Sequence, residues 1–290
     1  MRISFSAVDQ YAGCSLQYMF QRRLHLPVRT TGLALIAGSC GHKALEELDN
    51  SIESPTKLMP KSEMLEIFDN NWTSSRLEND INITDADFDE QGSIIKTLLS
   101  LYYDKYYGTE WFNPSIATEF WFEVPLIDLQ TGEVLLEDHI LIGKIDRINE
   151  FNNMLLVTDH KFTKYKYSQE KVDESNQLTF YLYVLEYLIS QNAITNFNNL
   201  PLGGCFSALY KQKNPFVNIH TTIRKYKDIK RLSGIIQTAV KGIQKDIYIP
   251  ADGSMKCTYC DYKEACRLWG TEDDWEEIYL KNIRKTKDGK

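Results

Sequence analysis

Two aspartates and a lysine near the middle of the chain have the types and the spacing of a metal-dependent hydrolytic site. Asp159 and Lys161 lie two residues apart in a segment rich in Leu and Val, and Asp146 lies in the segment before it. Two carboxylates brought together at neutral pH repel each other unless a cation lies between them, and hard oxygen ligands favour Mg²⁺ or Mn²⁺. A neighbouring lysine can orient or help deprotonate a water molecule, or stabilise charge on a phosphate. The constellation suits hydrolysis of a phosphodiester.

A β-hairpin is expected to position these side chains. Residues 140–148 are predicted to form one strand, the Asn152-Asn153 pair a turn, and residues 154–161 a second strand. Side chains two residues apart on a strand share a face, so Asp159 and Lys161 should project together, with His160 on the opposite face. The alternative is that the charged residues are solvated groups on a plain hairpin.

A helix predicted over residues 35–48 carries a further candidate, His42. Gly38 and Gly41 precede this histidine and should let another element approach closely, and Glu46 shares its face. A lone helix histidine is more often a packed or surface residue than a metal ligand, but the glycines favour a functional role.

Four of the six cysteines suggest a second metal centre. Cys257, Cys260 and Cys266 lie in a loop too short to have its own core, and three thiolates this close imply a metal. A structural zinc or iron-sulfur site needs a fourth ligand, for which Cys14, expected inside a first helix that Ser6 caps, is the remaining candidate. Spacing does not separate zinc from iron-sulfur, and unliganded thiols are the alternative. The other two cysteines, Cys40 and Cys205, are interpreted as structural.

The remaining pattern supplies a helical region, further strands and a basic loop. We predict helices over 62–76, 88–107 and 225–247, strands over 117–126, 134–148, 203–210 and 217–222, and loops over 78–87 and 162–173. Lys164 and Lys166 in the last loop are suited to a phosphate backbone. Ser175 should cap a helix on which Gln177 and Tyr181 share a face. Glu119 and Glu123 on the first strand are either auxiliary ligands or solvated charges.

Composition limits the class of protein. The chain has 290 residues, of which 43% are hydrophobic and 25% charged, and its formal net charge is −7. These values are ordinary for a globular protein, and the charge argues against non-specific binding of polyanions, so any nucleic acid must meet a local basic surface. Neither a membrane span nor a signal peptide is evident, which predicts a cytoplasmic protein without a membrane partner.

In their order, these motifs resemble the PD-(D/E)XK nuclease superfamily, specifically its RecB-like branch with an iron-sulfur cluster, as in AddB nuclease domains and CRISPR-associated RecB-type exonucleases. The matching pieces are Cys14, residues 38–42, Gly143-x-x-Asp146, Asp159-His160-Lys161, Gln177-x-x-x-Tyr181, and the three later cysteines. The resemblance covers nearly the whole chain.

This resemblance implies an α/β fold with an αβββαβ core, in which helices flank a mixed sheet. It implies one nuclease domain over residues 1–290, with a helical insertion at 50–116 and a cysteine segment at 250–270 joined to Cys14 by a 4Fe-4S cluster, with zinc the less favoured metal. His42, Asp146, Asp159 and the backbone carbonyl of His160 would bind Mg²⁺ or Mn²⁺. Lys161 would be the catalytic lysine, and Gln177 and Tyr181 would shape the DNA-binding side.

The implied activity is that of a DNA nuclease, and an exonuclease that acts on DNA ends or single strands is favoured over an endonuclease. The implied process is recombination, repair, or the processing of CRISPR or mobile-element DNA. No Gly-x-x-x-x-Gly-Lys-Ser/Thr motif occurs, so the chain carries no motor of its own, and a helicase or integrase-type partner is expected. Relatives often have an apolar residue in place of His160, so this histidine is expected either to contact the metal ligands from behind or DNA, or to lie at a partly exposed strand edge. They also often have proline in place of Ser15. One alternative function is a non-catalytic iron-sulfur subunit for DNA binding or assembly. A second is a zinc-stapled structural protein in which the Asp-Lys hairpin is coincidental.

Overall fold

A mixed sheet forms the centre of the protein. The computed structural model describes residues 1–28, 32–78, 84–195 and 200–288. In this part of the chain the strand order is β1-β3-β4-β5-β6, with β2 paired to β3. The strands are β1 (Arg2–Ser4), β2 (Ala117–Pro125), β3 (Ile140–Phe151), β4 (Met154–Thr163), β5 (Leu202–Tyr210) and β6 (Phe216–Thr222). Since β4 and β5 are parallel while β3–β4 and β5–β6 are antiparallel, the predicted mixed α/β sheet is confirmed.

The predicted hairpin is present as β3 and β4. Asn152 and Asn153 both adopt a positive φ, at 51° and 56°, which is the backbone of a tight two-residue turn that asparagine tolerates. The prediction that β3 begins at residue 134 is wrong. Val134 forms only an isolated bridge with Ile127, and the regular ladder starts at Ile140. The Thr131-Gly132 turn therefore leads into irregular chain before the strand.

The two strands of the hairpin separate where the candidate catalytic residues lie. On one edge, β3 pairs with β1 only at residues 140–142 and with β4 only from Arg147 onward. Residues 143–146 of β3 therefore have no strand partner on that edge within the described residues. Because no backbone ladder joins the two strands here, Asp146 can contact the end of β4 through its side chain.

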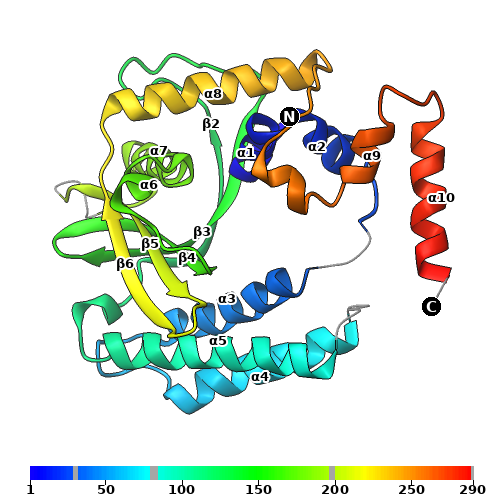
Figure 1. Ribbon diagram of the computed structural model, residues 1–290. Coiled ribbons are helices and arrows are strands. Elements are labelled where there is room, and N and C mark those ends of the chain that lie inside the picture. Colours follow the sequence, from blue (N-terminus) through cyan, green and yellow to red (C-terminus); the bar gives the residue numbers. More distant parts are fainter. Residues whose placement is uncertain (29–31, 79–83, 196–199, 289–290) are drawn as a thin grey trace.

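Helices cover both faces of the sheet (Figure 1). One face packs on α1 (Phe5–Gly13), α7 (Asn176–Ser190) and α8 (Tyr226–Gln244), and the other on α3 (Leu33–Ser51), α4 (Lys61–Glu78) and α5 (Asp85–Tyr106). The buried residues of α8 recur at helical spacing, as Ile229, Leu232, Ile236, Val240 and Ile243 do, so its apolar stripe faces the core. Half of the loop predicted at 78–87, residues 79–83, lies outside the described residues. The prediction is wrong for residues 85–87, which form the first turn of α5.

The order α3, β2, β3, β4, α7, β5 follows the αβββαβ core that the sequence predicts. Short elements complete the fold: η2 (Glu110–Phe112), α6 (Gln169–Asp173) and η3 (Met255–Tyr259). Ser175 caps α7 as expected, since its side chain accepts a hydrogen bond from the backbone N–H of Leu178. The predicted loop at 162–173 instead contains the end of β4 and α6. No helix of the described residues is long and apolar enough to cross a membrane.

The first helical region is interrupted, contrary to prediction. Ser4, not Ser6, caps α1, and Cys14 adopts an extended backbone between α1 and α2 (Ser15–Tyr18), which a π-helical turn, η1 (Met19–Arg23), follows. Cys14 therefore lies at a break and not inside a helix. The break turns α2 toward α9 (Lys263–Leu268) and α10 (Trp275–Asp288), with which it shares a small apolar core. The two ends of the chain thus pack together (Figure 1).

Candidate active site

Helix α3 brings His42 to the open side of the hairpin. A Cβ added at Gly41 would lie only 2.5 Å from the ring of Phe162 on β4, so this glycine permits close approach of strand and helix, as predicted. Gly38 was expected to do the same and does not, because nothing lies within 4 Å of a Cβ at that position. Nδ1 of His42 lies 3.5 Å from Oδ2 of Asp146.

The acidic residues and the lysine come together as the strand pattern predicts. Nζ of Lys161 lies 2.6 Å from Oδ2 of Asp159, while Nε2 of Gln177 donates to Oδ1 of the same carboxylate at 2.8 Å. Gln177 also donates to the hydroxyl of Tyr181 at 3.3 Å, so these two α7 residues share the face that borders the site. Asp146 accepts a hydrogen bond of 2.8 Å from the backbone N–H of His160. Five predicted positions therefore meet around one opening.

Burial and mutual charge shift the pKa values of these groups. Burial, and then the charge of Asp159, raise the pKa of Asp146 to about 7. Burial and the positive charges nearby, His160 first, lower the pKa of His42 to about 3, which leaves a neutral imidazole at neutral pH. Burial is the largest single influence on Lys161 and would lower its pKa, but the charge and hydrogen bond of Asp159 together with the charge of Asp146 outweigh it and raise that pKa. Lys161 is therefore an ammonium group that can donate hydrogen bonds.

The donor set suits a hard divalent cation in chemical type. Two carboxylates that repel each other and one neutral imidazole are groups that a cation would stabilise. As they stand, no three His, Cys, Asp or Glu side chains of the described residues are close enough together to hold a metal ion. The Asp159 carboxylate is turned toward Lys161 and Gln177 instead, so a bound cation would draw it toward Asp146.

His160 is buried behind the site, so of the roles that the sequence left open for it, a contact from behind the ligands fits and a partly exposed strand edge does not. Its ring points to the opposite face from Asp159, as expected, and there Nε2 lies 3.2 Å from Oδ2 of Asp49 on α3. Burial would lower the pKa of His160, but the hydrogen bond and charge of Asp49 outweigh it and raise the pKa. The metal-binding role predicted for its carbonyl stays a prediction.

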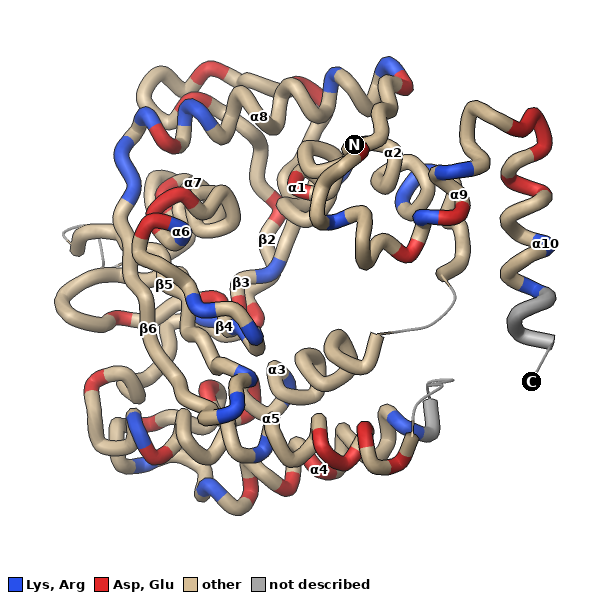
Figure 2. The backbone as a smooth tube through the Cα atoms, in the orientation of Figure 1, with Lys and Arg blue, Asp and Glu red and all other residues tan. Residues whose placement is uncertain are grey.

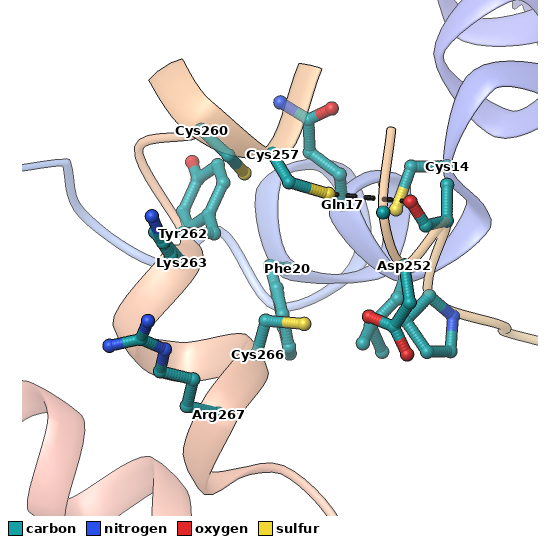
Figure 3. Close-up of a pocket in the computed structure, with 14 residues that line it drawn as sticks. Cys14, Gln17, Phe20, Asp252, Cys257, Cys260, Tyr262, Lys263, Cys266 and Arg267 are labelled. Carbon is teal, nitrogen blue, oxygen red and sulfur yellow. Dashed lines mark hydrogen bonds between the residues drawn. The ribbon is translucent and has the colours of Figure 1, made fainter. Parts of the chain in front are cut away.

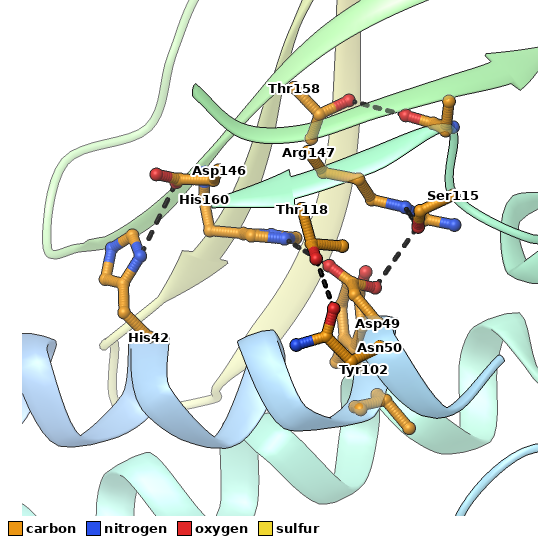
Figure 4. Close-up of polar contacts among 12 residues, drawn as sticks. His42, Asp49, Asn50, Tyr102, Ser115, Thr118, Asp146, Arg147, Thr158 and His160 are labelled. Atoms are coloured by element: carbon orange, nitrogen blue, oxygen red, sulfur yellow. Dashed lines mark hydrogen bonds and ion pairs between the residues drawn. The ribbon is translucent and has the colours of Figure 1, made fainter. Parts of the chain in front are cut away.

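Asp49 also meets Arg147, the residue after Asp146. Nη1 of Arg147 lies 3.5 Å from Oδ1 of Asp49, and all three side chains of this group are nearly or fully buried (Figure 4). Other atoms of Arg147 donate to the hydroxyl of Ser115 at 2.8 Å and to the carbonyl of Asn113 at 2.9 Å. Sequence reasoning missed Asp49, although its position seven residues after His42 puts both on one side of the helix.

Glu119 lies beside the site and Glu123 does not. Glu119 has a φ of 46° in the middle of β2, at the position opposite Asp146, and its side chain forms an ion pair with Lys144. A positive φ is rare for a residue with a side chain and marks a local distortion of the strand pair. Its carboxylate is mostly shielded from solvent and adds to the raised pKa of Asp146. Glu123 instead pairs with Arg2 at the far end of the strand.

The predicted basic loop lies at the end of β4, next to the opening. Lys164 and Lys166 are exposed, as is Tyr165 between them, at 81%. Lys211 lies near Lys164, since burial and the charge of Lys164 lower the pKa of Lys211. Figure 2 shows several Lys and Arg segments gathered around the end of β4, on a molecule whose charge is otherwise mixed. The exposed Lys164 and Lys166 therefore make the end of β4 locally basic despite the negative net charge.

The four predicted cysteine ligands line a single pocket of about 150 Å³ between the two ends of the chain. Figure 3 shows Cys14, Cys257, Cys260 and Cys266 around it. Burial raises the pKa of Cys260 and of Cys266, and the charges of the other cysteines in the pocket add to both shifts. The break before α2 directs Cys14 toward this loop. By contrast, Cys40 and Cys205 are buried in the core, which confirms their structural interpretation.

Fold and site together define an α/β protein in which two carboxylates and a lysine lie at the opening of a β-hairpin. The family model of the PD-(D/E)XK nuclease superfamily matches residues 2–267, and the chain therefore belongs to that superfamily. Nucleases of this superfamily typically use Mg²⁺ or Mn²⁺ and act on DNA.

Solved structures show more distant similarity. A crystal structure of a "putative exonuclease" from Eubacterium rectale is 13% identical, with a TM-score of 0.49, over 89% of this chain and 87% of that one. A structure named SSO0001 is 17% identical, with a TM-score of 0.28, over 51% of this chain and 57% of that one. No curated protein matched the chain.

Proposed function

We propose that this nuclease is a RecB-like deoxyribonuclease that removes nucleotides from DNA ends or single strands. The observation that carries the proposal is the meeting of Asp146, Asp159 and Lys161 in the opening of the β3–β4 hairpin, with His42 and Gln177 at its border. His42, Asp146 and Asp159 would hold Mg²⁺ or Mn²⁺. When bound, the cation would polarise the scissile phosphate and lower the pKa of the attacking water.

The protein's own residues supply orientation and charge. Lys161, kept protonated by Asp159, would donate a hydrogen bond to the attacking water or to the phosphate, and thus stabilise charge that develops on it. Gln177 holds Asp159 from the other side, which fixes the carboxylate between two donors. The exposed Lys164, Lys166 and Tyr165 would contact the backbone and bases of the strand that enters.

The cysteine pocket supports a 4Fe-4S cluster as a structural staple. Four cysteines from segments more than 200 residues apart line it, and a metal centre there would stabilise their thiolates and hold the two ends of the chain together. Zinc is the second choice. Anaerobic purification distinguishes them, because an iron-sulfur protein is brown and a zinc protein is colourless.

The decisive experiment is digestion of end-labelled linear single- and double-stranded DNA with Mg²⁺ or Mn²⁺. We expect wild type to release short products from the ends, Lys161→Ala to lose this activity, and Lys227→Ala, an exposed lysine on α8, to keep it. Uncut circular single strands alongside digested linear ones would support an exonuclease. Absence of cleavage by cluster-loaded wild type would favour a non-catalytic DNA-binding or assembly subunit, in which the metal site persists without turnover. A helicase or integrase-type protein remains the proposed partner in either case.

A further inference from the structure

A buried charged group lies directly behind the proposed metal site. It consists of Asp49 on α3, Arg147 on β3 and His160 on β4, which are 3%, 0% and 2% exposed. We refer to these residues as the buried triad. Buried charges without good pairing are costly, and here Oδ1 of Asp49, Nη1 of Arg147 and Nδ1 of His160 all lack a hydrogen bond. Buried charges that are imperfectly paired contribute little to the stability of a fold. The presence of the buried triad behind the proposed metal site therefore needs another explanation.

The position of each member relative to the site provides that explanation. Arg147 directly follows Asp146, and His160 directly follows Asp159, so each proposed carboxylate ligand has a basic neighbour that points to the opposite face. Both basic side chains converge on Asp49, which lies on the same helix as His42. A single buried carboxylate thus contacts the neighbours of both carboxylates and shares a helix with the histidine (Figure 4).

The neighbouring contacts strengthen the same connection. Asn50, next to Asp49, bonds to the Thr118 hydroxyl on β2, so the end of α3 contacts three adjacent strands. Tyr102 of α5 packs its ring edge-on against His160, with the ring centroids 5.9 Å apart, and accepts a hydrogen bond of 2.7 Å from Trp111. These contacts hold the His160 ring in place. The backbone N–H of the same residue donates to Asp146.

We infer that Asp49 is a positioning residue for the metal site, which sets the distance between His42 on α3 and the two carboxylates on β3 and β4 through Arg147 and His160. The inference rests on the proposed function, because it assumes that His42, Asp146 and Asp159 are the ligands. Groups that orient ligands from behind change metal affinity by roughly 10–100-fold when they are removed. A role in stability alone would lower the melting temperature and leave the affinity of the folded protein unchanged.

The test is a titration with Mn²⁺ of the folded protein, freed of Mg²⁺ and Mn²⁺ but with the metal centre of its cysteine pocket left in place, in which electron paramagnetic resonance measures the free ion. We expect Asp49→Asn, which keeps the shape and removes the charge, to raise the Mn²⁺ dissociation constant at least tenfold. Ile236→Ala, a buried position on α8 away from the site, is the control for lost stability and should stay within twofold of wild type. An unchanged dissociation constant in folded Asp49→Asn would overturn the inference.

A second pair of variants tests the positioning role of Asp49 if Asp49→Asn does not fold. His160→Gln keeps a side-chain donor for Asp49, whereas His160→Leu removes it, so we expect Gln to retain most of the affinity and Leu to lose at least tenfold. Equal affinities in the two variants would refute a positioning role. Failure of wild type itself to bind Mn²⁺ would refute the proposed function and this inference with it. That outcome differs from normal Mn²⁺ binding in both wild type and Asp49→Asn, which would refute the inference alone.

Discussion

Two glycines on one helix, Gly38 and Gly41, should respond in opposite ways to the same substitution. Replacing glycine by alanine inside a helix gains about 1 kcal/mol of helix propensity. At Gly38 nothing lies within 4 Å of the new Cβ, so Gly38→Ala should raise the free energy of unfolding by about 1 kcal/mol. The change tests helix propensity without a packing change.

At Gly41 the new methyl group would lie 2.5, 2.8 and 3.0 Å from three ring atoms of Phe162. Carbon atoms pack at about 3.5 Å or more, so the ring must retreat by roughly 1 Å. Overpacking of this kind costs about 1–3 kcal/mol, and after the gain in propensity Gly41→Ala should be less stable than wild type by about 0–2 kcal/mol. The two variants should therefore differ by about 1–3 kcal/mol.

Urea denaturation followed by circular dichroism measures both variants against wild type. The ring centroid of Phe162 is 5.7 Å from that of His42, so its displacement should also weaken Mn²⁺ binding in Gly41→Ala and not in Gly38→Ala. If Gly41→Ala is as stable as Gly38→Ala and binds Mn²⁺ normally, the ring moves aside freely. The close approach of α3 and β4 would then not depend on this glycine.

Three further predictions concern single groups. The pKa of Asp146 is raised to about 7, so the folded, metal-free protein binds a proton there that the unfolded chain releases above about pH 4. The contribution of this carboxyl to stability is therefore present at low pH and lost as the pH rises toward 7, and Asp146→Asn should remove that part of the pH dependence in thermal melts with chelator. Mg²⁺ binding at pH 6 should release a proton, which calorimetry in buffers of different ionisation enthalpy detects; release of equal size in Asp146→Asn would contradict this. Ser175→Ala removes the cap of α7 and should cost about 0.5–2 kcal/mol in urea denaturation. Cys266→Ser should lower the iron or zinc content of anaerobically purified protein, whereas Cys205→Ser should leave it unchanged, and equal contents in both would argue against the cysteine pocket as a metal site.

The hairpin and the placement of its side chains were predictable from the sequence because they depend on local rules. Alternation along a strand places Asp159 and Lys161 together, helical spacing places Gln177 beside Tyr181, and the Asn152-Asn153 pair specifies the turn. The element order could likewise be read from periodicity. Each of these features is decided by residues within a few positions of one another.

Features that depend on contacts across the fold were predicted less well. The break at Cys14 was missed although Gly13, a common helix-ending residue, directly precedes it, because the residues on both sides keep helical spacing. The helix after the break, α2, packs on α9 and α10. The start of β3 was predicted too early, because alternating residues after Gly132 lack a partner strand. Asp49 was missed for the same reason, since its partners lie about 100 residues further along the chain.

The opening of the hairpin explains why such a long-range contact is needed. A regular ladder would fix the spacing of β3 and β4 by backbone hydrogen bonds, but the strand pairing begins only at Arg147, beyond Asp146. The distance between Asp146 and Asp159 therefore depends on side-chain contacts. One is the hydrogen bond that the backbone N–H of His160 donates to the Asp146 carboxylate, and the others are the ion pairs of the buried triad behind it. Because the carboxylates repel each other, the opening would widen without these contacts. Separated strands make room for a cation, and Asp49 limits how far they separate.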